Sequence, residues 1–362
     1  MNHTISTVNH EMDFRDLLKA LWDGKLIIFL VTLLCTLVSV VFALSAQELW
    51  SSKAKIVKAQ PQDIAAYQNQ IKQFQPIFNV FQEDGTVLVS KELDRLGDSS
   101  VLFQRFVNAF NSANNKQVFL DGSAAFQQFK SDYFSDKPEI TEGSVRSLYS
   151  GWFKRITAFA ESRGDHSSPY FVSFQTTTKE SSFELLTSYI SFTETQIQQD
   201  AFNNLQAVIN GKKNELVQQK HMLEAQAKGL LLVETERTQY AMEIARATGV
   251  ELPIQTGNDN EIFSIELGSK GLEAKVQALR SVKNLSVIEP RLQQINAKLD
   301  MLNNLKIDRD VNFQTFRFLE SVEQPIARDK PKRFLIALIG IALGGIFGVV
   351  IVLMRFFYRK GY

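Results

Sequence analysis

The stretch LIIFLVTLLCTLVSVVFALSA, residues 26–46, holds 21 residues without a single charge. A second uncharged stretch of the same length, FLIALIGIALGGIFGVVIVLM, occupies residues 334–354. A helix rises about 1.5 Å per residue, so each stretch is long enough to cross the roughly 30 Å hydrocarbon core of a bilayer. Both are therefore predicted to be transmembrane helices, and they enclose nearly the whole chain.

The alternative for residues 26–46 is a cleaved signal peptide, because Ala43 and Ser45 could form a small-residue cleavage site. A signal core is shorter, about 7–15 residues, and here four acidic residues precede it between positions 11 and 23. These features favour a retained span. Cys35 is the only cysteine and lies within this span, where we expect a small apolar residue facing lipid or a neighbouring helix.

Residues 47–333 form one soluble block, whereas only short segments precede the first span and follow the second. Both ends are therefore expected on the same side of the membrane. Lys and Arg flank the spans on both sides, and the positive-inside rule applies to loops below about 60 residues, so charge does not assign the side.

The overall composition excludes two classes of protein. The 362 residues include 40 Lys plus Arg against 39 Asp plus Glu, so a net charge of +1 gives no sequence-wide field for nucleic acid. A charged fraction of 22% is too low for a disordered polyelectrolyte.

The expected fold class is α+β, with two transmembrane helices flanking a membrane-proximal α/β base and a very long protruding helical arm. The expected segments are an N-terminal segment 1–25, the first span 26–46, the base 47–178, the arm with its return helices 179–312, a base strand and proline connector 313–333, the second span 334–354 and a tail 355–362.

Within the base, residue patterns predict three strands and four helices. The strands are expected at 51–58, 170–178 and 313–319, and the helices at 61–74, 92–110, 123–134 and 143–161. A small sheet joining the beginning and end of the domain is plausible, because the last two strands flank the helical middle.

The arm is predicted from residues 179–248, which are rich in Gln, Glu, Lys, Leu and Ala and contain no proline. Unbroken, this helix would be about 100 Å long. A stripe of apolar residues recurs every seven positions. It comprises Ile209, Leu216, Leu223 and Leu230. The companion heptad position is mostly polar, so the stripe indicates packing along one edge rather than a strong two-stranded coiled coil.

Residues 249–261 are expected to form the turn at the far end of the arm, and two return helices follow, over 269–283 and from Pro290 onward. An arm of this kind buries little surface by itself. We therefore expect lateral packing of several copies of the chain, a homo-oligomer.

No catalytic residue, metal site or cofactor site is predicted. The four histidines are scattered without metal-ligand spacing, no phosphate-binding loop occurs, and Gly268-Ser269-Lys270-Gly271 is more typical of a helix start. The 28 phenylalanines could offer stacking platforms for carbohydrate, although packing in the core of a helical domain is their commoner use.

The second span contains regularly spaced glycines. Gly340, Gly344 and Gly348 recur every four residues, and Gly345 adjoins them. This spacing places bare backbone on one helix face, where another helix can approach closely. The alternative is a chance excess, because glycine is common in spans.

The proline connector, PIARDKPKR, occupies residues 325–333. The candidate functional residues of this connector are Pro325, Arg328, Asp329, Pro331 and Lys332. The prolines favour an extended, stiff segment, with cations at headgroup depth. Ordinary snorkelling of flanking cations explains these charges; the sharper alternative is attraction of a lipid-linked phosphate or an acidic partner surface.

The connector and second span resemble the Wzz chain-length determinants, the class 1 polysaccharide co-polymerases. That family carries Ser-Pro-Lys, eleven residues, and then Gly-Gly-Met-x-Gly-Ala-Gly. Here Pro331-Lys332 is followed by residues 333–343 and then by the sequence GGIFG at 344–348. The sequence departs from the family pattern at Lys330, at Ile346 and at residues 349–350.

Further resemblances lie at MDFRDLLKALWDGK (12–25), WSSKAKI (50–56) and FSIELGSKGLEA (263–274), the last similar to a Leu-Gly-Ser-x-x-Leu motif. The resemblance implies a two-pass bacterial inner-membrane protein with cytoplasmic termini and a large periplasmic domain. It also implies a bell-shaped homo-oligomer that sets the chain length of O-antigen or a related polysaccharide made by an undecaprenyl-linked polymerase.

Two functions follow as hypotheses. The first is a non-enzymatic chain-length regulator, whose partners are further copies of itself, a membrane polymerase and a lipid-linked glycan. The second is a structural adaptor or export component for an envelope polysaccharide. A co-polymerase tyrosine kinase is disfavoured, because few residues follow the second span and no phosphate loop is present.

Overall fold

The computed structural model describes residues 14–82, 84–135, 139–162, 168–254 and 262–360. The chain divides into two compact units. The first unit contains both candidate spans and consists of residues 1–57, 107–193 and 318–362. The second unit consists of residues 58–106 and 194–317. Part of the expected turn at 249–261 lies outside the described residues.

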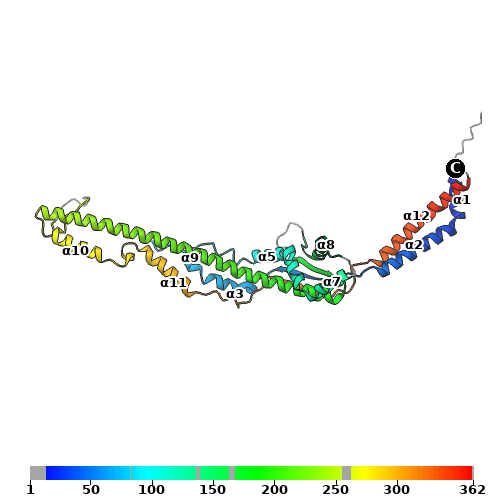
Figure 1. Cartoon of the computed structure of the whole chain (residues 1–362), viewed down its shortest axis with the longest axis horizontal. Coiled ribbons are helices and arrows are strands. Elements are labelled where there is room, and N and C mark those ends of the chain that lie inside the picture. Colours follow the sequence, from blue (N-terminus) through cyan, green and yellow to red (C-terminus); the bar gives the residue numbers. More distant parts are fainter. Residues whose placement is uncertain (1–13, 83, 136–138, 163–167, 255–261, 361–362) are drawn as a thin grey trace, which may run out of the picture. The chain divides into compact units, whose positions relative to one another are not determined.

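The described residues are mostly helical, with one small sheet and one short hairpin (Figure 1). The α-helices are α1 (Phe14–Asp23), α2 (Lys25–Ser45), α3 (Pro61–Lys72), α4 (Gln75–Phe78), α5 (Ser99–Asn111), α6 (Ala113–Gly122), α7 (Ala124–Ser135), α8 (Glu142–Phe153), α9 (Lys179–Ala247), α10 (Gly268–Ser281), α11 (Arg291–Asn304) and α12 (Arg333–Lys360). The strands are β1 (Trp50–Lys58), β2 (Val80–Phe81), β3 (Val87–Leu88), β4 (Ile156–Ala160), β5 (Tyr170–Thr176) and β6 (Phe316–Glu323).

The sheet has the strand order β4-β5-β1-β6. β1 pairs antiparallel with β5, with Ala54 opposite Val172, and β4 pairs antiparallel with the other edge of β5. Alternate residues of β1 and β5 are buried, as the two-residue period of a strand requires when one face is covered. The expected strands at 51–58 and 170–178 are thereby confirmed, and the third begins at Phe316 instead of residue 313.

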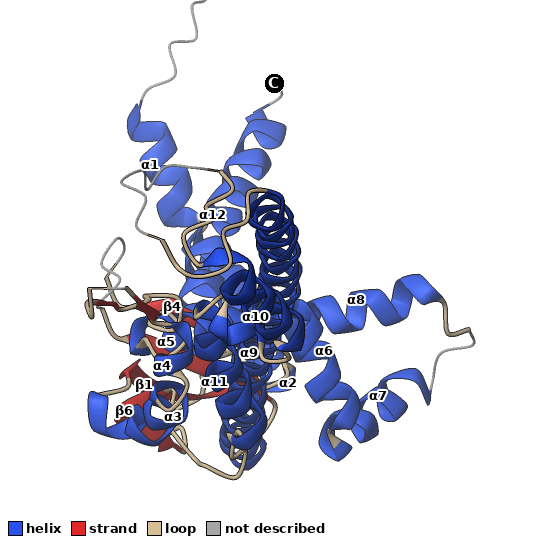
Figure 2. Cartoon of the chain, turned by 90° about the vertical axis from the view of Figure 1, so that its left-hand side faces the viewer, coloured by secondary structure: helices blue, strands red, loops and turns tan. Residues whose placement is uncertain are grey.

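Aromatic side chains build the core of the first unit. Phe119 contacts the rings of Phe174 and Tyr189, and Tyr189 donates a 2.8 Å hydrogen bond to the carbonyl of Phe110. Burial raises the pKa of Tyr189, because its neutral form is favoured away from water. Helices α6, α7 and α8 lie beside one another in the same unit (Figure 2). Core packing is therefore the use of these aromatic residues.

The long helix is confirmed in α9, which runs without interruption for 69 residues, equivalent to about 100 Å. In the second unit its buried face joins one apolar cluster with α3 and α11. Ile209, Leu216 and Leu223 lie in that cluster, together with Leu292 and Ile295 of α11. The two return helices are also confirmed, as α10 and α11.

Three expectations for the base were wrong. The helix expected over 143–161 ends at Phe153, and residues 156–160 form β4 because pairing with β5 satisfies their backbone groups. The helix expected from residue 92 begins at Ser99, where Asp98 accepts a 2.8 Å bond from the Ser100 amide. Residues 113–122 form α6, where no helix was expected.

Gly268 fixes the return of the chain at the start of α10. Its φ is +66°, and a Cβ added there would lie 2.7 Å from the backbone of Glu251 and Leu252. The neighbouring Ser269 amide donates a 2.9 Å bond to Val250. This geometry explains why glycine stands in the Leu-Gly-Ser motif.

The substitution Gly268→Ala is expected to destabilise this return by about 2 kcal/mol, because it adds left-handed strain and a backbone overlap. Faster amide exchange in α10, followed by mass spectrometry, would report the loss. Gly229→Ala is the matched control, because nothing lies within 4 Å of its Cβ position in α9. That change is expected to stabilise the helix by up to about 1 kcal/mol. Equal exchange in both variants would contradict the expectation.

Candidate functional site

The two candidate spans pack against each other through glycine. A Cβ at Gly344 would lie 2.8 Å from the Cα of Thr32 and 2.9 Å from the Cβ of Cys35, and a Cβ at Gly348 would lie 2.8 Å from the Cα of Ile28. A Cβ at Gly340 would likewise overlap the side chain of Ser39. These pairs run in opposite directions along the two helices, so α2 and α12 are antiparallel neighbours (Figure 1).

The glycine spacing in the second span did not identify every glycine at this helix contact correctly. Gly345 has nothing within 4 Å of its Cβ position, so it lies outside the contact between α2 and α12. Gly24, which sequence reasoning did not select, lies against Val352 near the other end of the pair. A period of four selects one helix face, and Gly345 falls one residue away from that face.

An ion-paired clamp lies just outside both spans. We define the clamp as Glu48, Arg328 and Arg333. The Glu48 carboxylate is 2.8 Å from Arg328 and 2.9 Å from Arg333. A backbone bond from the Leu49 amide to the Lys330 carbonyl, 3.1 Å long, runs alongside it. The clamp therefore joins the chain leaving α2 to the connector that enters α12.

The clamp engages part of the proline connector. Arg328 is paired with Glu48, and Asp329 accepts a 2.9 Å bond from Gln175 of β5. Pro325 and Pro331 are half-buried, whereas Lys332 is exposed. Arg328 and Lys332 are the two cations singled out from the sequence, and only Lys332 of this pair is exposed. A role for Lys332 toward phosphate or an acidic partner stays a prediction.

The arm stripe divides into two parts. Ile209, Leu216 and Leu223 are buried in the core of the second unit, but Leu230 is 50% exposed within the chain. Nearby on α9, Leu232 and Val233 are also exposed. The distal part of the stripe therefore presents apolar side chains that the described residues of this chain leave exposed.

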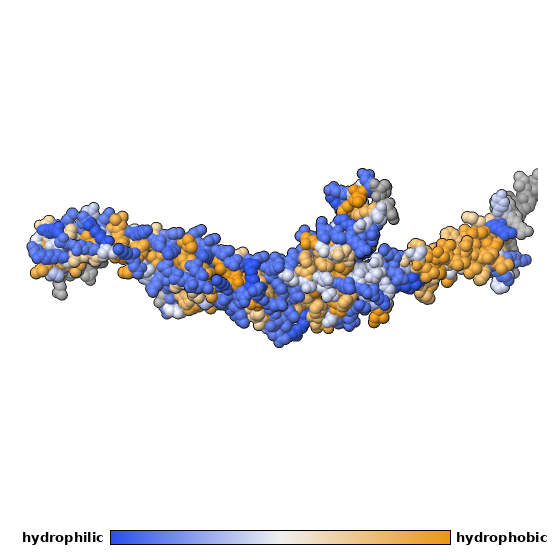
Figure 3. Space-filling view, turned by 60° about the horizontal axis from the view of Figure 1, so that its bottom comes forward, coloured by the Kyte–Doolittle hydropathy of each residue, from blue (hydrophilic) through white to orange (hydrophobic). Residues whose placement is uncertain are grey.

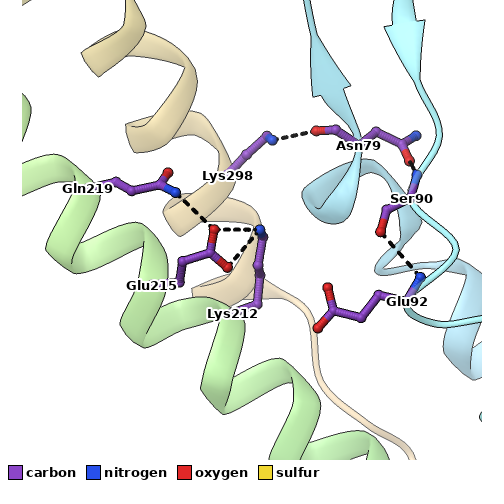
Figure 4. Close-up of polar contacts among 7 residues, drawn as sticks. All are labelled: Asn79, Ser90, Glu92, Lys212, Glu215, Gln219 and Lys298. Atoms are coloured by element: carbon purple, nitrogen blue, oxygen red, sulfur yellow. Dashed lines mark hydrogen bonds and ion pairs between the residues drawn. The ribbon is translucent and has the colours of Figure 1, made fainter.

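A groove of about 720 Å³ opens in the second unit beside this stripe. Its walls are α9, α11 and the hairpin formed by β2 and β3, and its lining includes Phe81, Lys212, Gln219, Arg291 and Lys298. Figure 4 shows the polar contacts at one end, where α9, α11 and the segment that carries Asn79 meet. Helix α11 thus places Lys298 opposite Lys212 of α9.

Lys212 and Lys298, the two lysines that line the groove, have different partners. Both carboxylate oxygens of Glu215 lie 2.9 Å from the Lys212 nitrogen, and one accepts a 2.8 Å bond from Gln219 (Figure 4). Lys298 donates to the backbone carbonyl of Asn79 at 2.5 Å. Burial lowers the pKa of Lys298, and the positive charge of Lys212 lowers it further.

Sequence reasoning missed both the clamp acid Glu48 and the groove. A signal for Lys298 was present, because it lies three residues after Ile295 and four before Leu302, on the apolar face of its helix. No comparable local signal marks Phe81, which reaches the groove from a hairpin distant in sequence. Among the described residues, no group of three or more His, Cys, Asp or Glu side chains could hold a metal ion.

Comparisons with known proteins agree with this architecture. The family model for Wzz, chain length determinant protein, matches residues 10–94. The ferric enterobactin transport protein FepE of Escherichia coli (strain K12) is 24% identical over 97% of this chain and 90% of its own length. The chain length determinant protein of the same strain is 26% identical, over 98% of this chain and 96% of its own.

A solved structure described as a full-length bacterial polysaccharide co-polymerase shares the fold. It aligns with a TM-score of 0.60 at 22% identity and covers 96% of this chain and 99% of its own. The resemblance to the Wzz chain-length determinants is thus confirmed by the family model at the start of the chain and by relatives that align over nearly its whole length.

Proposed function

We propose that the protein is a non-enzymatic regulator of the chain length of O-antigen or a related lipopolysaccharide glycan. It acts as a homo-oligomeric co-polymerase beside an undecaprenyl-linked glycan polymerase in the membrane. The observation that carries this proposal is similarity along nearly the full length to relatives named as chain length determinants.

The proposed location is the bacterial inner membrane, with both termini in the cytoplasm and the large domain in the periplasm. Support comes from α2 and α12, the two helices within the described residues that are long and apolar enough to cross a membrane. Their surface is almost continuously hydrophobic (Figure 3), as contact with lipid requires. Because the two helices are antiparallel, the ends of the chain emerge on the same side.

Assembly with further copies is supported by the exposed apolar part of α9. Leu230, Val233 and Ile244 lie on one face of α9 and are between 42% and 50% exposed. A row of this kind along a solvated helix is favoured when another subunit covers it. The detergent-solubilised protein is therefore expected to have the mass of an oligomer in multi-angle light scattering, and a monomer would contradict this part of the proposal.

The decisive experiment is deletion of the gene in its own host, followed by electrophoresis of the surface polysaccharide. The preferred length is expected to disappear while synthesis continues, and the wild-type gene is expected to restore it. An unaltered ladder in the deletion strain would overturn the proposed function.

The alternative, an adaptor or export component for an envelope polysaccharide, gives another pattern in the same strain. Surface polysaccharide would be lost, but the length of the remaining chains would not change. Loss of growth on ferric enterobactin with an unchanged ladder would instead support the transport role in the name of FepE.

A further inference from the structure

We propose that the groove between α9, α11 and the β2–β3 hairpin binds an acidic saccharide, through a ring stacked on Phe81 and a carboxylate beside Lys298. The choice of a saccharide rests on the proposed function, whereas the site itself rests on the geometry of the second unit. The groove volume of about 720 Å³ lies within the range of about 300–1,000 Å³ typical of small-molecule sites.

The apolar part of the groove suits the C–H face of a sugar ring. Its floor includes Leu216, Leu223 and Ile295, which are buried members of the core cluster and so hold a fixed position. At the rim, Phe81 is 45% exposed, unlike the aromatic residues of the first unit's core. An exposed ring on a two-stranded hairpin beside a concave surface provides a stacking platform.

The polar part of the groove suits hydroxyl groups. Gln82, Gln219 and Gln294 line it, and an amide side chain both donates and accepts hydrogen bonds. A sugar hydroxyl also donates and accepts, so the two kinds of group are complementary. This mixture of amides and apolar side chains is less suited to a purely hydrocarbon ligand.

The charged part of the groove selects an anion. Glu215 engages Lys212, and Glu289 engages Arg291 with contacts of 2.6 and 2.8 Å. No carboxylate within the described part of the chain lies within 4 Å of the Lys298 nitrogen, although an ammonium has three hydrogens to donate. The Asn79 carbonyl accepts one of them. The negative charge of Glu215 also acts on Lys298, but its oxygens are bonded to Lys212 and Gln219, so a ligand carboxylate would supply the direct ion pair.

The positions of Phe81 and Lys298 place the two contacts next to each other. The Lys298 nitrogen lies over the Phe81 ring, 5.8 Å from its centre, so a sugar ring stacked on the rest of that face would lie beside the ammonium. A uronic acid stacked on that ring carries its carboxylate at the edge of the sugar, within reach of the ammonium. Asp84 also lines the groove, and its negative charge disfavours an anion at the hairpin end.

The test is calorimetric titration of the full-length protein in nanodiscs with tetragalacturonate and, as the neutral comparison, maltotetraose. The wild type is expected to bind tetragalacturonate at least tenfold more tightly than maltotetraose, with weaker binding at high salt. Lys298→Met and Phe81→Ala are each expected to weaken binding at least tenfold. Lys228→Met is the matched control, because Lys228 is exposed on α9 and outside the groove lining.

Equal binding of the two saccharides, no binding of tetragalacturonate, or unchanged binding by Lys298→Met would overturn the site. Because Phe81 is 45% exposed, Phe81→Ala is expected to retain the fold, and it keeps the test valid if Lys298→Met unfolds. The deletion experiment separates this inference from the proposed function. Binding with an unchanged ladder would leave the site and remove the proposed function, whereas an altered ladder without binding would do the reverse.

Discussion

Gly344→Leu is expected to force α2 and α12 apart and to broaden the length distribution of the polysaccharide in a complemented deletion strain. Even the first added carbon would lie 2.8 Å from the Thr32 Cα and 2.9 Å from the Cys35 Cβ. The Thr32 atom belongs to the backbone, so relief requires a helix to move rather than a side chain to rotate. Overpacking of this kind costs about 1–3 kcal/mol, and more where backbone must shift.

Gly345→Leu is the matched control for this prediction. It makes the same chemical change one residue away in the same helix, and nothing lies within 4 Å of its Cβ position. The control is expected to keep the wild-type ladder and the wild-type oligomer mass in detergent. An unchanged modal length and mass for Gly344→Leu, or equal defects in both variants, would show that the glycine contact has no role in assembly or length control.

The comparison of these glycines shows what sequence patterns could predict. The period of four identified a face of α12, because helical geometry is local and repeats regularly. The partner face, formed by Ile28, Thr32 and Cys35, could not be derived, since side chains on a lone apolar helix do not reveal which of its faces meets protein and which meets lipid. Gly24 was missed for the same reason.

Long regular elements were predicted well, and short ones were not. The composition of residues 179–248 favours a helix at nearly every position, so α9 was found within one residue of its end. In contrast, β4 has only five residues, ITAFA, and its strand conformation depends on pairing with β5. The groove depends on three segments that meet only after folding, around Phe81, Lys212 and Lys298.

Leu216→Ala is expected to destabilise the second unit by about 3 kcal/mol, whereas Leu230→Ala is expected to cost less than about 1 kcal/mol. Both residues occupy the same heptad position of α9. Leu216 is 2% exposed within the core cluster, and its truncation leaves a cavity against α11, but Leu230 is 50% exposed and its truncation leaves none. Amide exchange in α11 measures the first loss without requiring the whole protein to unfold.

The pair of variants also separates folding from assembly. Because the exposed Leu230 is available to another copy of the chain, Leu230→Ala is expected to lower the oligomer mass in dilute detergent while leaving amide exchange in α11 unchanged. Leu216→Ala, in contrast, is expected to accelerate amide exchange in α11. If Leu230→Ala accelerated exchange in α11 as strongly as Leu216→Ala, the stripe would serve the fold of one chain along its whole length, and another surface would have to join the subunits.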